Sequence, residues 1–231
     1  MVSSIVFLIA ALIIVLVGAI LQGVFIAVEH KEKYVPAVIL KGLASCCFVL
    51  VGFLGYKIAG NASFAKMVFL GLIFGALGDI FLNLRFVFEK QGQKIFLLGI
   101  ALFLTGHILY LVALIPLSTN LIICLVIGAV LAAVLLTIIF KKFEVKIAFK
   151  IFGIFYLGAI CLMTVVAIGN LIALQDANRI LYAIGAVAFL ISDVVLIFNT
   201  FGSSTRFSMR ITNLSFYYLG QILIALSLFF I

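Results

Sequence analysis

The sequence predicts an all-α, polytopic membrane protein with eight transmembrane helices. Of its 231 residues, 68% are hydrophobic and only 10% are charged, whereas a soluble domain is about 45–50% apolar and about 25% charged. The mean hydropathy is +1.50, and the apolar runs are long enough to cross a hydrocarbon core of about 30 Å. The period-two alternation of barrel strands is weak, which favours helices. We therefore expect one integral membrane domain over residues 1–231, whose spans hold the function.

The eight spans follow from apolar runs of roughly 20 residues each. The first ends at the polar turn E-H-K-E-K, and Pro36 stands near the start of the second, where proline suits a helix. Pro116 closes the fourth, and a tight turn at 117–120 leads into the fifth. The predicted spans are 4–28, 35–55, 66–84, 94–115, 121–140, 145–173, 179–201 and 212–231.

The distribution of basic residues predicts the orientation. Eleven of the 15 Lys and Arg residues fall in odd-numbered loops, three fall in even-numbered loops, and Lys41 lies inside the second span. Because cytoplasmic loops carry the excess of Lys and Arg, we expect odd-numbered loops in the cytoplasm and both termini outside. The net charge of +8 comes without a long basic run, so membrane lipid is an expected partner and nucleic acid is not.

The sequence also suggests an internal repeat. Asp79 is followed 28 residues later by His107, Asp193 is followed 28 residues later by Gln221, and a glycine precedes both second residues. The carboxylates have similar surroundings, L-G-D-I-F-L and I-S-D-V-V-L. We predict two four-span halves, 1–116 and 117–231, which are parallel because each has an even number of spans. Chance matching among Leu-rich helices is the alternative.

Asp79 and Asp193 are the strongest functional candidates. They are the only carboxylates inside the apolar interiors, where a charged side chain costs at least about 2.5–3.5 kcal/mol and usually serves a function. Counted from the span ends, both lie in the predicted cytoplasmic half together with Lys41, and His107 lies nearer the middle. Lys41 is a natural counter-charge for one carboxylate. Alternatively, it snorkels to the surface.

The remaining candidates are polar residues placed on shared helix faces. Asn83 follows Asp79 by one turn, and Tyr110 follows His107 by three residues. Tyrosines at such places commonly anchor helices, buried amides commonly join them, and a lone buried histidine is commonly a satisfied core residue. As substrate-binding residues we predict Lys41, Asn83, His107, Tyr110, Tyr156, Ser192, Tyr217 and Gln221.

Four motifs carry a resemblance to a known family. They are G-D-I-F-L-N-L around Asp79, G-H-I-L-Y from Gly106, A-F-L-I-S-D ending at Asp193, and Y-Y-L-G-Q-I-L-I near the carboxyl end. In this order they resemble the YhhN family of membrane lysoplasmalogenases. The family often has a Lys-Pro pair in the second span, whereas Lys41 is followed here by Gly42.

The resemblance implies an eight-helix hydrolase that cleaves the vinyl ether bond of lysoplasmalogens to a fatty aldehyde and a glycerophospho-base. It implies a single-chain ether phospholipid as substrate, water as cosubstrate, and no metal or organic cofactor. Its two catalytic aspartates map onto Asp79 and Asp193, and which of them holds the proton is open. We expect a location in a bacterial cell (inner) membrane. The alternatives are a small proton-coupled transporter that uses the same carboxylates and a purely structural lipid-binding bundle.

Overall fold

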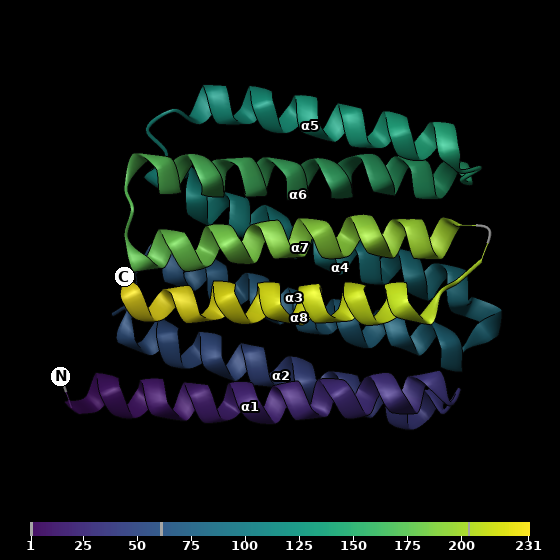
Figure 1. The fold of residues 1–231 in the computed structure, drawn as a ribbon, viewed down its shortest axis with the longest axis horizontal. Helices are drawn as coiled ribbons and strands as arrows, with labels where there is room; N and C mark the ends of the chain where they lie inside the picture. Colours follow the sequence, from purple (N-terminus) through teal and green to yellow (C-terminus); the bar gives the residue numbers. More distant parts are fainter. Residues whose placement is uncertain (1, 61, 203) are drawn as a thin grey trace.

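The computed structural model describes residues 2–60, 62–202 and 204–231, and over these ranges the chain forms eight long α-helices and no strand (Figure 1). All eight are long and apolar enough to cross a membrane, which confirms the predicted polytopic fold. The helices are α1 (Val2–His30), α2 (Tyr34–Ile58), α3 (Ser63–Val87), α4 (Gly92–Leu114), α5 (Leu121–Lys142), α6 (Ile147–Ala173), α7 (Ala177–Phe201) and α8 (Phe207–Ser227), with short 3-10 turns at Glu89–Gln91, Ile115–Leu117 and Leu228–Phe230.

Local chemistry explains where these helices begin and end. α4 ends at Leu114, and Pro116 lies in the 3-10 turn that follows, as predicted. α7 begins two residues before its predicted start, because the Asp176 side chain caps it by accepting a hydrogen bond of 2.8 Å from the Arg179 backbone N–H. The Arg179 guanidinium also pairs with this carboxylate.

The start of α8 differs most from the prediction. The apolar run begins near residue 212, but the helix begins at Phe207. Its first turns are polar and are held by other elements. The Arg206 backbone N–H donates to Asn199 Oδ1 at 2.8 Å, and the Arg210 guanidinium donates to both oxygens of Glu29, at 2.9 and 2.5 Å. Hydropathy alone does not detect such a turn, because tertiary contacts stabilise it.

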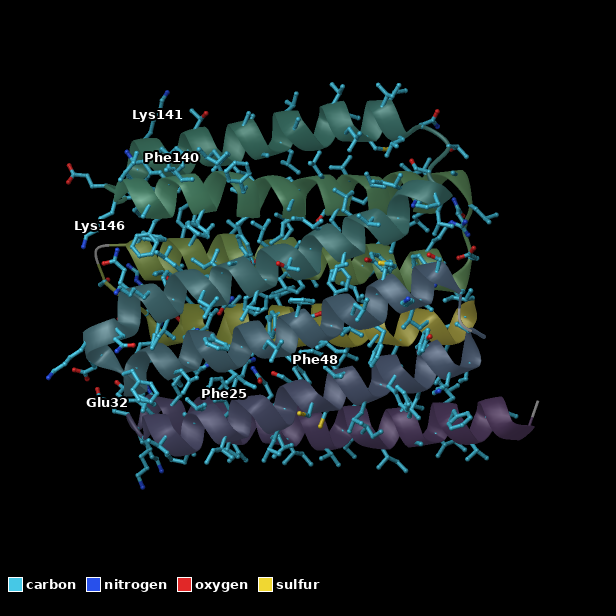
Figure 2. The ribbon with its side chains drawn as sticks, turned by 180° about the vertical axis from the view of Figure 1, so that it is seen from behind. Phe25, Glu32, Phe48, Phe140, Lys141 and Lys146 are labelled. Atoms are coloured by element: carbon cyan, nitrogen blue, oxygen red, sulfur yellow. The ribbon has the colours of Figure 1, made fainter. Side chains whose placement is uncertain are left out.

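The helices run side by side along one direction, and both termini lie at the same end of the bundle (Figure 1). The loops after α1, α3, α5 and α7 lie at the opposite end, called here the odd-loop end. Figure 2 shows Glu32, Lys141 and Lys146 there. Helices α1 and α5 form the edges of the bundle and expose apolar side chains, such as Leu16 (64% exposed) and Ile122 (78% exposed). Among the described helices α8 is the most buried.

Two glycine crossings lie at equivalent places in the two predicted halves. A Cβ atom on Gly106 would come 3.1 Å from the carbonyl oxygen of Gly71, and one on Gly220 would come 2.9 Å from that of Gly185. The backbones of α3 and α4, and of α7 and α8, therefore touch directly. Each crossing precedes its aspartate by eight residues on α3 or α7. In addition, the fourth helix of each half packs on the second helix of the other half, α4 on α6 and α8 on α2. These correspondences support the internal repeat, which stays a prediction.

Candidate active site

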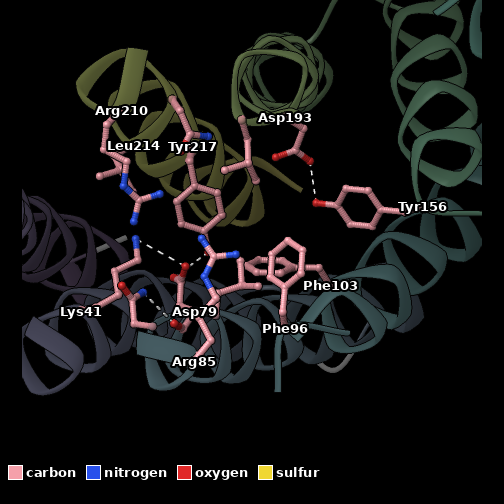
Figure 3. Close-up of a pocket in the computed structure, with 14 residues that line it drawn as sticks. Lys41, Asp79, Arg85, Phe96, Phe103, Tyr156, Asp193, Arg210, Leu214 and Tyr217 are labelled. Carbon is pink, nitrogen blue, oxygen red and sulfur yellow. Dashed lines mark hydrogen bonds and ion pairs between the residues drawn. The ribbon is translucent and has the colours of Figure 1, made fainter. Parts of the chain in front are cut away.

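A small cavity between the helices brings the two aspartates together. Its volume is about 40 Å³, room for roughly three or four water molecules at about 10–15 Å³ each. Figure 3 shows Asp79 with Lys41 on one side of it and Asp193 with Tyr156 on the other. The lining residues are Lys41, Asp79, Leu82, Asn83, Arg85, Phe96, Phe103, Tyr156, Asp193, Leu196, Arg210, Asn213, Leu214 and Tyr217.

Asp79 is held by one cation and two hydroxyl groups. Its Oδ1 lies 3.4 Å from Lys41 Nζ, and these side chains are only 5% and 1% exposed. Its Oδ2 accepts hydrogen bonds from Ser45 Oγ at 2.5 Å and from Tyr217 OH at 2.7 Å. A buried carboxylate is tolerated only when such partners offset the loss of hydration. The contact with Lys41 agrees with its predicted place as counter-charge.

Lys41 has two further partners, Gln22 and Tyr217. Its Nζ donates to Gln22 Oε1 at 3.3 Å, and it lies 4.5 Å from the centre of the Tyr217 ring, a cation–π distance. Ser45 and Gln22 were not among the predicted site residues, although the sequence carries a signal for each. Ser45 follows Lys41 by four residues and so shares its helix face. Gln22 is an amide inside the otherwise apolar first span.

Asp193 has a simpler environment than Asp79. It is 3% exposed, and its Oδ2 accepts a hydrogen bond of 2.6 Å from Tyr156 OH. Within the described ranges, no Lys, Arg or His nitrogen lies within ion-pair distance of it. The two aspartates thus occupy one cavity with unlike partners.

Ser192, the neighbour of Asp193, serves the contact between helices. Its Oγ donates to the Asn213 carbonyl oxygen at 3.0 Å, and Asn213 Nδ2 donates to its Oγ at 2.8 Å and to its carbonyl oxygen at 3.0 Å. These bonds join α7 to α8. Ser192 does not line the cavity.

A chain of polar side chains extends from Asp79 toward the centre of the bundle. Gln221 Nε2 donates to Tyr217 OH at 3.4 Å, and Tyr110 OH donates to Gln221 Oε1 at 2.8 Å. Tyr110 and Gln221 therefore act on the site through Tyr217, since neither lines the cavity.

The glycines of α3 make this packing possible. A Cβ on Gly71 would come 2.3 Å from the Tyr110 ring, one on Gly75 would come 2.5 Å from Gln221 Nε2, and one on Gly78 would come 2.7 Å from the Phe103 ring. All three distances are too short for real contacts. The glycine spacing before Asp79 therefore allows side chains of α4 and α8 to reach α3.

Two more predicted residues have different placements. Asn83 lines the cavity, and its Nδ2 donates to the Asp79 carbonyl oxygen at 2.9 Å. His107 is 1% exposed and does not line it. The His107 ring packs edge-on against Phe189, with ring centres 4.6 Å apart, and against Tyr156, at 5.4 Å. Neither His107 nitrogen has a hydrogen-bond partner among the described residues. Its role in substrate binding stays a prediction.

We expect His107→Leu to unfold at the same temperature as the wild type or at a higher one. An unsatisfied buried polar group costs about 1–3 kcal/mol, and an apolar group of similar shape avoids this cost. Circular dichroism during heating in detergent measures the change. A midpoint several degrees lower would contradict the expectation and would indicate that the imidazole has a stabilising partner.

Six of the ten predicted site residues line the cavity, namely Lys41, Asp79, Asn83, Tyr156, Asp193 and Tyr217. Within the part of the chain that the structure describes, no group of three or more His, Cys, Asp or Glu side chains is placed to hold a metal ion.

Comparison with known proteins places the chain in a family. A search of curated proteins and a search of solved structures found no match. The model of the YhhN family matches residues 33–228, a range that begins just before α2 and includes all the residues lining the cavity. The chain therefore belongs to the YhhN family.

Proposed function

We propose that this protein hydrolyses the vinyl ether bond of a lysoplasmalogen, releasing a fatty aldehyde and a glycerophospho-base. The observation that carries the proposal is the pair of aspartates in one buried cavity of about 40 Å³. Lys41 lies within ion-pair distance of Asp79, whereas among the described residues no cation lies within that distance of Asp193. Two carboxyl groups in unlike environments are the arrangement that general acid–base hydrolysis uses. Membership of the YhhN family supports the same reaction class.

The contacts favour Asp79 as the charged partner and Asp193 as the proton donor. Lys41 Nζ at 3.4 Å and the hydroxyl donors Ser45 and Tyr217 all stabilise the ionised form of Asp79. Asp193 has one hydroxyl donor, Tyr156, at 2.6 Å. With less stabilisation of its charge, Asp193 is the carboxyl group better suited to carry the proton.

In the proposed reaction Asp193 delivers its proton to the β-carbon of the vinyl ether, and the π electrons of the double bond form the new C–H bond. The carbon attached to the ether oxygen becomes part of an oxocarbenium ion, which the Asp79 carboxylate stabilises. Water attacks this carbon and passes a proton to the Asp193 carboxylate. The resulting hemiacetal then transfers its hydroxyl proton to the glycerol oxygen through a carboxylate, and the C–O bond breaks. One water molecule is consumed, and Asp193 ends protonated.

The surroundings of the carboxyl groups suit a lipid substrate. Leu82, Phe96, Phe103, Leu196 and Leu214 contribute apolar walls to the cavity. Such walls suit the vinyl ether end of the alkenyl chain, whose entry requires the cavity to widen, and they limit the water that reaches the oxocarbenium ion. A site between transmembrane helices also receives a single-chain lipid without removing it fully from the membrane.

Release of aldehyde from 1-alkenyl lysophosphoethanolamine or lysophosphocholine tests the proposal. We expect the purified protein in detergent to release aldehyde, measured by coupled reduction with NADH. The saturated alkyl ether analogue is the matched control and yields none, because it has no double bond to protonate. In D₂O the aldehyde should carry one deuterium on the carbon next to the carbonyl. No aldehyde from folded protein with either headgroup would refute the proposal.

A transporter would be expected to have interrupted helices at the site. Carriers commonly bind their ions and substrates at helices that are interrupted at the site. Here the two helices that carry the aspartates, α3 and α7, run without a break. This continuity favours a fixed reaction site.

A further inference from the structure

A second, larger cavity adjoins the candidate active site at the odd-loop end. It measures about 510 Å³ and is formed by the ends of α1, α3 and α7 and the beginnings of α2 and α8. We call it the vestibule. Arg85, Leu196 and Arg210 line both the vestibule and the active-site cavity, so these residues mark the junction. A ligand group at the junction reaches the active site directly.

Two aromatic rings position the guanidinium group of Arg85. The Arg85 Cζ atom lies 4.5 Å from the centre of the Phe86 ring and 4.3 Å from that of Phe96, and such stacking holds the guanidinium plane. Its Nε is buried without a hydrogen-bond partner, and no carboxylate lies within ion-pair distance among the described residues. Figure 3 shows this side chain reaching into the middle of the pocket.

Arg210 lies on the opposite side of the junction and is fixed by a different means. Its guanidinium donates to both oxygens of Glu29, at 2.9 and 2.5 Å. That bond orients the side chain from the α1 side. Arg85 and Arg210 therefore place two guanidinium groups at one junction, and Glu29 pairs with Arg210 but not with Arg85. An anion that enters the junction can therefore interact with Arg85 and with Arg210, of which Arg210 is already paired with Glu29.

Guanidinium groups recognise phosphate through paired N–H donors in a fixed fork. We propose that Arg85, with Arg210, forms a phosphate-binding subsite for the headgroup of a single-chain phospholipid. The identity of the lipid rests on the proposed function, since only the glycerol unit separates the phosphate of a lysoplasmalogen from its vinyl ether. A phosphate at the junction therefore leaves the ether within reach of the aspartates.

The outer wall of the vestibule favours a lipid headgroup over free phosphate. It includes the Glu32 carboxylate together with the rings of Tyr34 and Phe86, which stack with their centres 5.2 Å apart. Glu29, which also lines the vestibule, is already paired with Arg210. The Glu32 carboxylate repels a free phosphate, but together with the aromatic faces it attracts the ammonium group of an ethanolamine or choline headgroup. Glu32 has a φ of +58°, a left-handed conformation that is uncommon for residues other than glycine and often marks functional sites.

Binding of a non-hydrolysable lipid tests the subsite independently of catalysis. The probe is a lysophosphocholine with a saturated alkyl ether chain, and its Kd is measured by microscale thermophoresis in detergent. We expect Arg85→Gln to weaken binding by at least about tenfold, as for the loss of charge-assisted hydrogen bonds, and to raise KM with little change in kcat. Arg85→Lys keeps the charge but loses the fork, and should bind with intermediate affinity. Wild-type affinity in Arg85→Gln would overturn the proposal. If that variant does not fold, wild-type affinity in Arg85→Lys would overturn it.

Lys142→Gln is the matched control for surface charge. Lys142 is an exposed cation at the odd-loop end that belongs to α5 and lies outside the vestibule. We expect this variant to bind the probe as the wild type does. An equal loss of affinity in Lys142→Gln and Arg85→Gln would mean that the effect is general charge attraction and would refute the subsite.

Competition experiments distinguish the source of the phosphate. We expect alkyl lysophosphocholine to displace a labelled probe at concentrations at which inorganic phosphate does not. Equal displacement by inorganic phosphate would refute a lipid-headgroup site. The proposed reaction and the subsite can fail separately. Arg85-dependent binding without aldehyde release would refute the hydrolase but not the subsite. Aldehyde release with an unchanged KM in Arg85→Gln would refute the subsite but not the hydrolase.

Discussion

Asp193→Asn is expected to lower the rate of vinyl ether hydrolysis by about 10²–10⁴-fold, the usual contribution of general acid–base catalysis. An amide has no proton to give to the β-carbon. The fold should change little, because the amide oxygen can still accept the hydrogen bond from Tyr156 that the Asp193 carboxyl oxygen accepts at 2.6 Å. Rates of aldehyde release at saturating lipid, together with thermal unfolding, check both parts.

Asp176→Asn provides the same chemical change on the other end of α7. Asp176 caps the helix from outside the cavity, and asparagine caps about as well as aspartate. We expect this control to keep wild-type activity. An Asp193→Asn enzyme with activity close to that of the control would remove Asp193 from the proposed mechanism.

Lys41→Met is expected to destabilise the protein by about 3–5 kcal/mol, because it leaves a buried carboxylate without its counter-charge. The lost contact is the one between Lys41 Nζ and Asp79 Oδ1, 3.4 Å apart and nearly inaccessible to solvent. Ser45 and Tyr217 remain as donors and keep the loss from being larger. Denaturant titration in mixed micelles measures the free energy of unfolding.

A double variant separates the charge effect from packing. Lys41→Met with Asp79→Asn removes both charges, so we expect it to recover much of the stability that Lys41→Met loses, without regaining activity. Lys57→Met is the control within α2, since Lys57 is exposed near the helix end, and it should change stability by no more than about 0.5 kcal/mol. Equal destabilisation by Lys41→Met and Lys57→Met would contradict the counter-charge role.

The sequence predicted which residues lie inside the membrane better than which of them touch. Hydropathy located the eight spans, and helical spacing placed Asp79 with Asn83 on one face, because both properties are local. The pairing of Tyr156 with Asp193 and of Tyr217 with Asp79 was not predicted, although all four residues were candidates. Such contacts depend on how each helix is rotated against its neighbours, which hydropathy does not encode.

Arg85 illustrates a second limit of the sequence. In the predicted spans it lies just beyond the end of 66–84 and counts only as a loop charge that sets orientation. In the structure α3 continues to Val87. The contacts with Phe86 and Phe96 hold the Arg85 side chain where it lines both cavities. An arginine near a span end has the same local sequence whether it snorkels to the surface or faces a pocket, so only the packing of α4 and α8 decides.

The Gly71–Gly106 and Gly185–Gly220 crossings also bear on rigidity. At these crossings two backbones are in contact, and no side chain lies between them that could change its rotamer. For this reason α3 cannot roll on α4, nor α7 on α8, without separating the backbones. Each aspartate lies about two turns from its crossing. The backbone contacts thus fix where the Cα atoms of the two aspartates lie relative to the neighbouring helices. A substrate of a different size is therefore not accommodated by shifting α3 on α4 or α7 on α8.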